Sequence, residues 1–263
     1  MMINRLFSNL TPIITACGFI FLFAPLVILV IYSFNSGSST VVWEGFGISA
    51  YKEALTDPRL QSGIYVSAIV AALSAFFSTL IGGLSALAVV KREFKGKTLF
   101  ATTLIAPLVL PEIVLAVGIL ITTIWAGVSL GYTTLVIGHV LISIPYSFLI
   151  IRASAAGFDH RLDEAAADLG ANGWVTFRKI TLPLLMPAVL SAFLLSAVLS
   201  FDNFVISTFV SGVGTTPLPI EIYASLKTGL TPKVNALGTM LIVLNVVVIL
   251  ICMKRFLNAN LNK

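Results

Sequence analysis

Six long hydrophobic runs, separated by shorter polar segments, make up most of this chain. The runs cover about residues 12–31, 64–90, 99–125, 134–151, 184–208 and 232–252. A helix needs roughly 20 apolar residues to cross a bilayer, so each run is a candidate span. The pattern predicts an all-α polytopic membrane protein with six transmembrane helices, forming a single domain over residues 1–263. A cleaved signal peptide is the alternative for the first run, although that run is long for one and no small-residue cleavage site follows it.

Composition and charge support a membrane protein and indicate its orientation. The chain is 58% hydrophobic and only 10% charged, whereas soluble domains carry roughly 25% charged residues. Of the 16 Lys and Arg residues, 12 fall on the side that holds both termini and 4 on the other. The positive-inside rule therefore predicts that both termini are cytoplasmic. The basic residues lie at the ends of the hydrophobic runs, which favours a topological role for them over nucleic-acid binding.

Two of the runs carry small residues at every fourth position. These are Ser74, Ser78, Gly82 and Ala86 in the second run, and Ala188, Ala192, Ser196 and Ser200 in the fifth. Small side chains on one face allow membrane helices to approach closely. We therefore predict that both faces lie at helix–helix contacts.

Polar residues inside the runs are candidates for a transport pathway. Glu112 follows two helix-breaking prolines in the third run, and at ~1.5 Å per residue it would lie about 20 Å deep in a straight helix. A carboxylate in hydrocarbon costs at least ~2.5 kcal/mol, so such acids usually face a cavity. We predict Glu112 as a pathway residue, Asp202 as a second acid, and Ser200 and Asn203 as neutral hydrogen-bond partners for a cargo.

The other polar residues do not form an enzyme site. The acidic residues in the runs are not paired with a base or a nucleophile, and neither histidine has a triad or metal partner in the sequence pattern. His139, inside the fourth run, is more typical of a hydrogen-bonded packing residue than of a functional one. Cys17 and Cys252 each lie in an apolar run and predict neither a disulfide framework nor a metal site. We expect a chain without catalytic residues or cofactors of its own.

The loop at residues 153–183 is the longest charged interruption in the second half of the chain. Asp159 is a candidate helix cap, and Gly170 can end the helix that follows. Asn172 can cap a second short helix over 174–180, which Pro183 is expected to end. The pattern predicts a compact helix–turn–helix unit, in which Ala165–Ala167 offer a low ridge to a partner. An ordinary re-entry loop is the alternative.

One motif in this loop resembles a known family. Glu164-Ala165-Ala166, Gly170, Ile180 and Leu182-Pro183 match the spacing of the EAA motif of ABC-importer permeases. The resemblance implies a type I ABC importer permease fold, in which this loop docks on a cytoplasmic ATPase dimer. It assigns ATPase coupling to Asp163, Glu164, Ala165, Ala166, Gly170 and Trp174. The chain has no GxxxxGK[ST] sequence, so ATP and Mg are expected on the partner.

The resemblance extends along nearly the whole chain and narrows the family. YSFN (32–35), PEIV (111–114), AAADLG (165–170), LSFDN (199–203) and KVNAL (233–237) are similar to the second permease of spermidine/putrescine importers. This implies half of a polyamine pathway in the bacterial inner membrane, a paralogous permease or second copy as partner, and an external substrate-binding protein. The chain departs from that pattern at Glu112, where aspartate is usual, and at Asn203, where an acid is usual. The second change lowers the acidic count and leaves the preferred polyamine open.

Three other functions fit parts of the pattern. An importer of the same type could carry another small solute, such as iron or an anion. A self-contained secondary transporter or channel would make the 153–183 loop an ordinary connection. A membrane scaffold without cargo is the most remote of the three.

Overall fold

The computed structural model describes residues 2–40, 42–159, 161–229 and 231–261. Helices dominate these residues, and their β pairing is limited to one isolated bridge between Asn35 and Phe46. The predicted all-α class is therefore confirmed.

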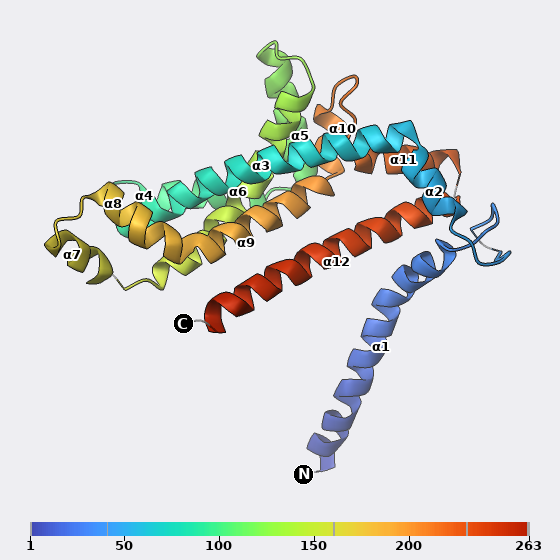
Figure 1. The fold of residues 1–263 in the computed structure, drawn as a ribbon, viewed down its shortest axis with the longest axis horizontal. Coiled ribbons are helices and arrows are strands. Elements are labelled where there is room, and N and C mark those ends of the chain that lie inside the picture. The colour runs from blue at the N-terminus through green and yellow to red at the C-terminus, as the bar shows by residue number, and fades with distance from the viewer. Residues whose placement is uncertain (1, 41, 160, 230, 262–263) are drawn as a thin grey trace. The chain divides into compact units, whose positions relative to one another are not determined.

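The helices are named in chain order (Figure 1). They are α1 (Met2–Tyr32), α2 (Ser49–Thr56), α3 (Pro58–Lys91), α4 (Lys97–Ile105), the 3-10 turn η1 (Ala106–Leu108), α5 (Glu112–Trp125), α6 (Tyr132–Ala156), α7 (Arg161–Asp168), α8 (Gly173–Thr176), the π-helical turn η2 (Phe177–Thr181), α9 (Leu182–Phe201), α10 (Val205–Val210), α11 (Leu218–Thr228) and α12 (Pro232–Leu261).

The chain forms two compact units, which we describe one at a time. Unit 1 comprises Met1–Gln61 and Ile222–Asn245, and unit 2 comprises Ser62–Glu221 and Val246–Lys263. Both candidate functional regions lie in unit 2. The prediction of one membrane domain over the whole chain stays a prediction.

Two clusters of polar side chains hold segments of unit 1 together. The buried Asn35 side chain donates to the carbonyls of Ser39 (2.7 Å) and Val42 (2.8 Å), and so holds the segment that follows α1. Lys233 at the start of α12 bonds to Asp57, between α2 and α3, and lies 3.6 Å from Glu53. The hydrogen bond from Lys233 holds the pKa of Asp57 below its usual range. This contribution to stability is therefore present above the ordinary carboxyl pKa and is lost as the pH falls through the lowered one.

Unit 2 is built on closely packed α3, α6 and α9. The predicted small-residue faces are buried: Ser74, Ser78 and Ala86 of α3 are fully covered, as are Ala192 and Ser196 of α9. Gly82 of α3 faces α6, where an added Cβ would lie 2.8 Å from the Phe148 backbone nitrogen. Between α6 and α9, the hydroxyls of Ser147 and Ser196 are 2.9 Å apart. The close-packing prediction is confirmed for both runs.

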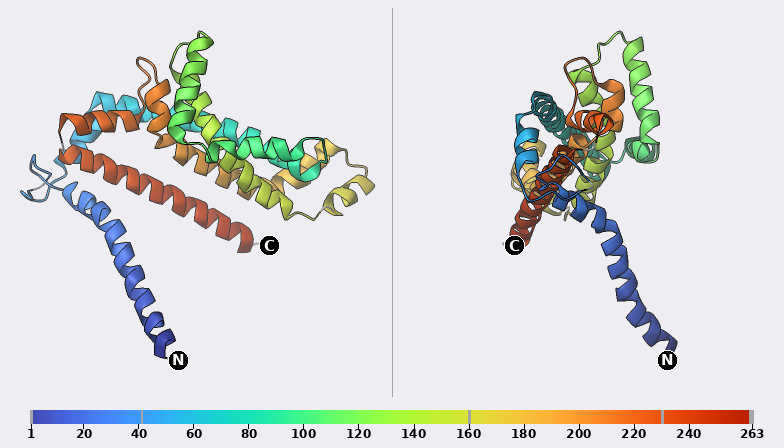
Figure 2. Two further views of the ribbon diagram at one scale, coloured as in Figure 1. Left: turned by 180° about the vertical axis from the view of Figure 1, so that it is seen from behind. Right: turned by 90° about the vertical axis from the view of Figure 1, so that its right-hand side faces the viewer.

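The third hydrophobic run is not a straight helix. The α4–η1 segment and α5 meet at 105°, at a break that contains Pro111 and follows Pro107 of η1. Figure 2 shows α5 standing away from the direction of α3 and α6, while α4 lies along α6. The chain turns immediately before Glu112, at the end of the α4–η1 segment, and the membrane depth predicted for this residue stays a prediction.

Four of the helices among the described residues are long and apolar enough to cross a membrane: residues 14–32, 58–91, 132–156 and 173–201. The bent α4–α5 pair makes a fifth if it counts as one span, and α12 adds a shorter apolar stretch, Pro232–Val247. A polytopic membrane fold is confirmed. The count of six spans and the cytoplasmic position of both termini stay predictions.

Candidate functional site

The 153–183 loop folds as its local signals predict over most of its length. The Asp159 carboxylate accepts from the Arg161 backbone N–H (3.0 Å) at the start of α7. Gly170 ends this helix with a φ of +79°, a conformation that favours glycine. The N–H groups of Gly170 and Ala171 bond back to the carbonyls of Ala167 and Ala166, both at 2.9 Å, which is the Schellman arrangement. The Asn172 side chain then accepts from Val175 N–H (2.9 Å) and caps α8.

The end of this loop differs from the prediction. The chain stays helical from Gly173 to Phe201, passing through Pro183 without a break. The π-helical turn over Phe177–Thr181 makes this possible, because Leu182 N–H bonds to the Phe177 carbonyl, five residues back. Pro183 follows directly after this π-turn, which changes the backbone hydrogen-bond spacing just before the proline.

The exposed surface of the loop carries charges of both signs and large apolar side chains rather than a plain alanine ridge. Glu164 and Ala165 are exposed, whereas Ala166 is only 5% exposed and packs inward, so the predicted ridge of three alanines is wrong at its centre. Two large apolar side chains stand out beside them, with Leu169 88% and Trp174 67% exposed. Exposed apolar groups rimmed by polar ones are typical of a protein-interaction surface.

The Asp163 side chain contacts another residue of this chain. Its carboxylate oxygens lie 2.7 and 3.0 Å from Lys91 Nζ, at the end of α3. The same ammonium donates to the Thr181 hydroxyl (2.9 Å), in the last residue of η2. Lys91 therefore ties α3 to two helical segments of the loop, through Asp163 of α7 and Thr181 of η2.

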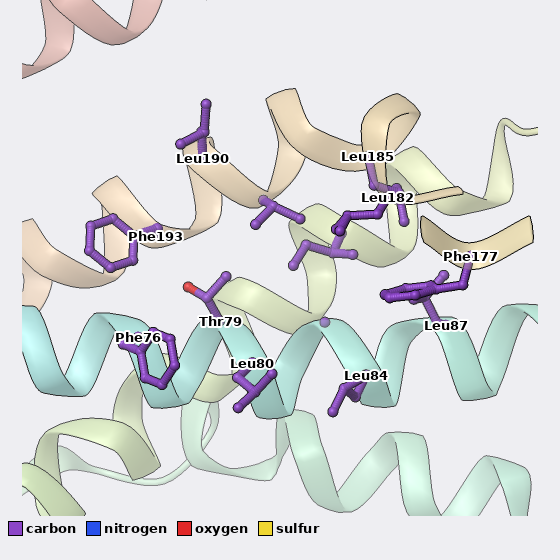
Figure 3. Close-up of a pocket in the computed structure, with 13 residues that line it drawn as sticks. Phe76, Thr79, Leu80, Leu84, Leu87, Phe177, Leu182, Leu185, Leu190 and Phe193 are labelled. Atoms are coloured by element: carbon purple, nitrogen blue, oxygen red, sulfur yellow. The ribbon is translucent and has the colours of Figure 1, made fainter. Parts of the chain in front are cut away.

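Phe177 closes an apolar groove between α3 and α9 (Figure 3). The groove has a volume of about 390 Å³ and includes Phe76, Leu80 and Leu84 of α3 and Phe193 of α9. Its lining carries no charged side chain. A polar cargo would lose its hydrogen bonds with water here without replacement, so this groove does not suit one.

A smaller cavity, of about 240 Å³, contains the predicted pathway acid. Glu112, the first residue of α5, shares this cavity with Tyr146 of α6 and Asn203, and apolar side chains from η1, α5, α6 and α9 complete its wall. Glu112 is half-buried. The cavity thus combines one carboxylate, one amide and one aromatic ring, a set that suits an ammonium group.

Asn203 lies in the break between α9 and α10 and contacts Glu112 directly. Its Nδ2 donates to Glu112 Oε1. Its Oδ1 accepts from the Ile206 backbone N–H (2.9 Å), which fixes the orientation of the amide. The structure therefore brings together Glu112 and Asn203, which are 91 residues apart in the chain.

The other two predicted pathway residues lie at the end of α9 and differ in exposure. Asp202 is exposed at the end of α9. Ser200 is buried, and its hydroxyl lies 2.7 Å from His139 Nδ1. Ser200 is thus already engaged in a contact within the chain. Direct contact of Asp202 or Ser200 with a cargo stays a prediction.

Sequence reasoning missed Tyr146, Lys91 and Thr181. Tyr146 lies one position after Pro145 in an apolar run and gives no local signal of a cavity. Lys91 was interpreted only as a topology signal, because its partners are 72 and 90 residues away. His139 was predicted as a packing residue, and its buried ring does bond to two serines.

Comparisons with known proteins agree on one family. Residues 78–259 match the family model described as "Binding-protein-dependent transport system inner membrane component". The "Spermidine/putrescine transport system permease protein PotC" of Haemophilus influenzae is 39% identical over 231 residues, which cover 88% of this chain and 90% of the relative. The "Putrescine transport system permease protein PotI" of Escherichia coli strain K12 is 36% identical over 237 residues, covering 88% and 84%.

Solved structures show the same fold at lower sequence identity. A chain of a bacterial ABC transporter involved in the import of the acidic polysaccharide alginate superposes with a TM-score of 0.73 and 17% identity, covering 96% of this chain and 97% of that one. A chain of the MetNI methionine ABC transporter gives a TM-score of 0.61 and 17% identity, covering 75% and 94%.

Proposed function

Because this chain belongs to the family of binding-protein-dependent transport system inner membrane components, we propose that it forms half of the pathway of an ATP-driven polyamine importer. Members of this family are non-catalytic, multi-pass subunits of the inner membrane. ATP and Mg²⁺ are assigned to a partner ATPase. The other half of the pathway is a paralogous permease or a second copy of this chain.

The cavity around Glu112 is the observation that supports an amine cargo. A half-buried carboxylate attracts an ammonium group more strongly than one in open water, because the surrounding dielectric is lower. Tyr146 adds an aromatic ring and Asn203 an amide. Its lining offers one carboxylate, so it can pair with one ammonium group of a polyamine at a time, which fits a pathway that must release its cargo.

The same cavity weighs against the alternative cargoes. An anion would meet the negative charge of Glu112. Ferric iron is a hard cation that needs several oxygen ligands, and the lining supplies a single carboxylate. The amine is therefore preferred among the small solutes considered.

The exposed face of the 153–183 loop is assigned to the ATPase. The residues assigned to it are Glu164, Ala165, Leu169 and Trp174, which are all exposed and combine a carboxylate with apolar side chains. Gly170 allows the turn that presents them. Ala166 and Asp163 support the face from inside, through packing and through the Lys91 ion pair.

Transport in vesicles tests this function. The chain is purified with its co-expressed ATPase, second permease and external binding protein, and the complex is placed in liposomes. We expect uptake of labelled spermidine or putrescine that requires ATP and the binding protein, and competition by unlabelled polyamine but not by phosphate or ferric citrate. A complex that retains the ATPase but moves none of the polyamines would contradict the cargo, and a chain that retains no ATPase would contradict the importer.

Replacing Lys91 by methionine is expected to weaken coupling. The change removes the ammonium that joins Asp163 and Thr181 to the end of α3. A partly exposed ion pair contributes up to ~1 kcal/mol, so the amount of cargo moved per ATP hydrolysed should fall by about threefold to fivefold. The measurement is the ratio of uptake to phosphate release in liposomes.

Lys97→Met is the matched control for that variant. Lys97, the first residue of α4, pairs at 2.6 Å with Glu93 in the segment between α3 and α4, and contacts no part of the loop through this pair. The Lys97→Met substitution removes one positive charge, as Lys91→Met does. Equal ratios of uptake to hydrolysis in the two variants would show that the contact of Lys91 with the loop has no part in coupling.

A further inference from the structure

His139 joins the two helices on either side of the break that carries Asn203. The ring is fully buried on α6. Its Nδ1 lies 2.7 Å from the hydroxyl of Ser200, in the last turn of α9, and its Nε2 lies 3.1 Å from the hydroxyl of Ser207 on α10. One imidazole therefore spans the interruption between α9 and α10.

The direction of each hydrogen bond in this group follows from its neighbours. The Ser207 hydroxyl lies 2.6 Å from the Asn203 carbonyl oxygen, which can only accept, so the serine proton is used there. His139 Nε2 must then donate to the Ser207 oxygen. In the neutral ring Nδ1 is left without a proton and accepts from Ser200.

This chain of bonds ends at the cargo cavity. It runs from Ser200 through His139 and Ser207 to the backbone of Asn203. The Asn203 amide is held by Ile206 N–H and donates to Glu112. The Asn203 backbone N–H bonds to the Ser200 carbonyl (3.4 Å), and the histidine acts through Ser207 on the Asn203 carbonyl, so it adds a restraint on the residue that carries the amide.

We propose that His139 is a positioning residue for the cargo cavity, acting through Ser207 and Asn203 on Glu112. Its effect on cargo rests on the proposed amine transport. The hydrogen-bond chain itself does not, because it is a property of the folded subunit. The two statements can therefore be tested separately.

The tautomer of His139 tests the chain of bonds without any cargo. The assembled complex is labelled with ¹⁵N-histidine in lipid, and the His139 signals are assigned by their loss in His139→Gln. We expect a ring that is protonated at Nε2 and bare at Nδ1 at neutral pH. A ring protonated at Nδ1 would overturn the proposed direction, whatever the complex transports.

Two substitutions at His139 test the positioning role. A glutamine carries both an acceptor and a donor and can replace the two bonds, whereas leucine can make neither. Buried hydrogen bonds of this kind are worth ~1–3 kcal/mol, so we expect His139→Leu to raise the half-saturating polyamine concentration about tenfold, with His139→Gln within about twofold of the native complex. Equal losses in the two variants would overturn the proposal.

A double-variant comparison separates positioning from general destabilisation. If His139 acts through Asn203, adding His139→Leu to Asn203→Ala should change the half-saturating concentration by less than about twofold. Losses that multiply would show that His139 acts independently of Asn203 and would overturn the proposal. If His139→Leu fails to assemble, Ser207→Ala takes its place in both comparisons, because it removes a single hydroxyl.

If the native complex moves no polyamine, the proposed cargo fails. The labelled spectrum then still decides the hydrogen-bond chain.

Discussion

Glu112→Gln is expected to reduce polyamine uptake by roughly tenfold to a hundredfold while the complex keeps its ATPase. The substitution preserves the shape of the side chain and its contact with Asn203 but removes the one carboxylate that lines the cavity. Hydrogen bonds to charged groups are worth ~1.5–3 kcal/mol, which corresponds to that range. The measurement is initial uptake of labelled spermidine and putrescine in liposomes over a series of concentrations.

Two further variants are needed to interpret that result, one as a control and one as a comparison. Glu93→Gln removes a negative charge from a side chain that is 89% exposed and paired locally with Lys97, so uptake should stay within about twofold. Asp202→Asn tests the second predicted acid, and we expect a smaller loss than at Glu112 because Asp202 is exposed. Unchanged uptake in both Glu112→Gln and Asp202→Asn would mean that acids do not guide the cargo.

Gly170→Arg is expected to abolish coupling to the ATPase. Gly170 holds a φ of +79°, and an ordinary side chain in this region costs ~1–2 kcal/mol. Space around a new Cβ is open, so the membrane helices should remain intact. A long cationic side chain would then be added to the exposed surface of the loop that is assigned to the ATPase. We expect the ATPase to be lost on purification and ATP-driven uptake to fall at least about tenfold.

Gly170→Asn and Gly173→Ala are matched controls for this change. Asparagine tolerates the left-handed conformation better than other side chains, so it tests bulk with less strain. Gly173 also has open space around an added Cβ and lacks the positive φ, so its alanine variant tests a small side chain without strain. Both should keep most of the ATPase. Retention of a normal complex by Gly170→Arg would contradict the docking role of this face.

Much of the local structure was predictable because it depends on neighbours in the chain. Asp159, Gly170 and Asn172 adopt the cap and turn roles that their side chains favour. The small residues at every fourth position face other helices, as the helical repeat requires. The EAA spacing indicated the family, which the comparisons confirm.

Two features of the backbone differ from what the local sequence predicted. Pro183 was predicted to end a helix, but the π-turn before it lets the helix continue. Glu112 was placed by a straight count, but the chain bends by 105° just before it. In each case the local sequence allows two paths.

The sequence alone determined that this chain is a helical membrane protein of the importer family, and it identified Glu112 and the 153–183 loop as the regions to test. Composition and residue spacing suffice for this, because lipid requires apolar spans and turns require particular residues. Only the tertiary structure joined Glu112 to Asn203, His139 to Ser200 and Ser207, and Lys91 to Asp163. These partners lie 61 to 91 residues apart. Their meeting depends on how whole helices pack, which no local pattern specifies.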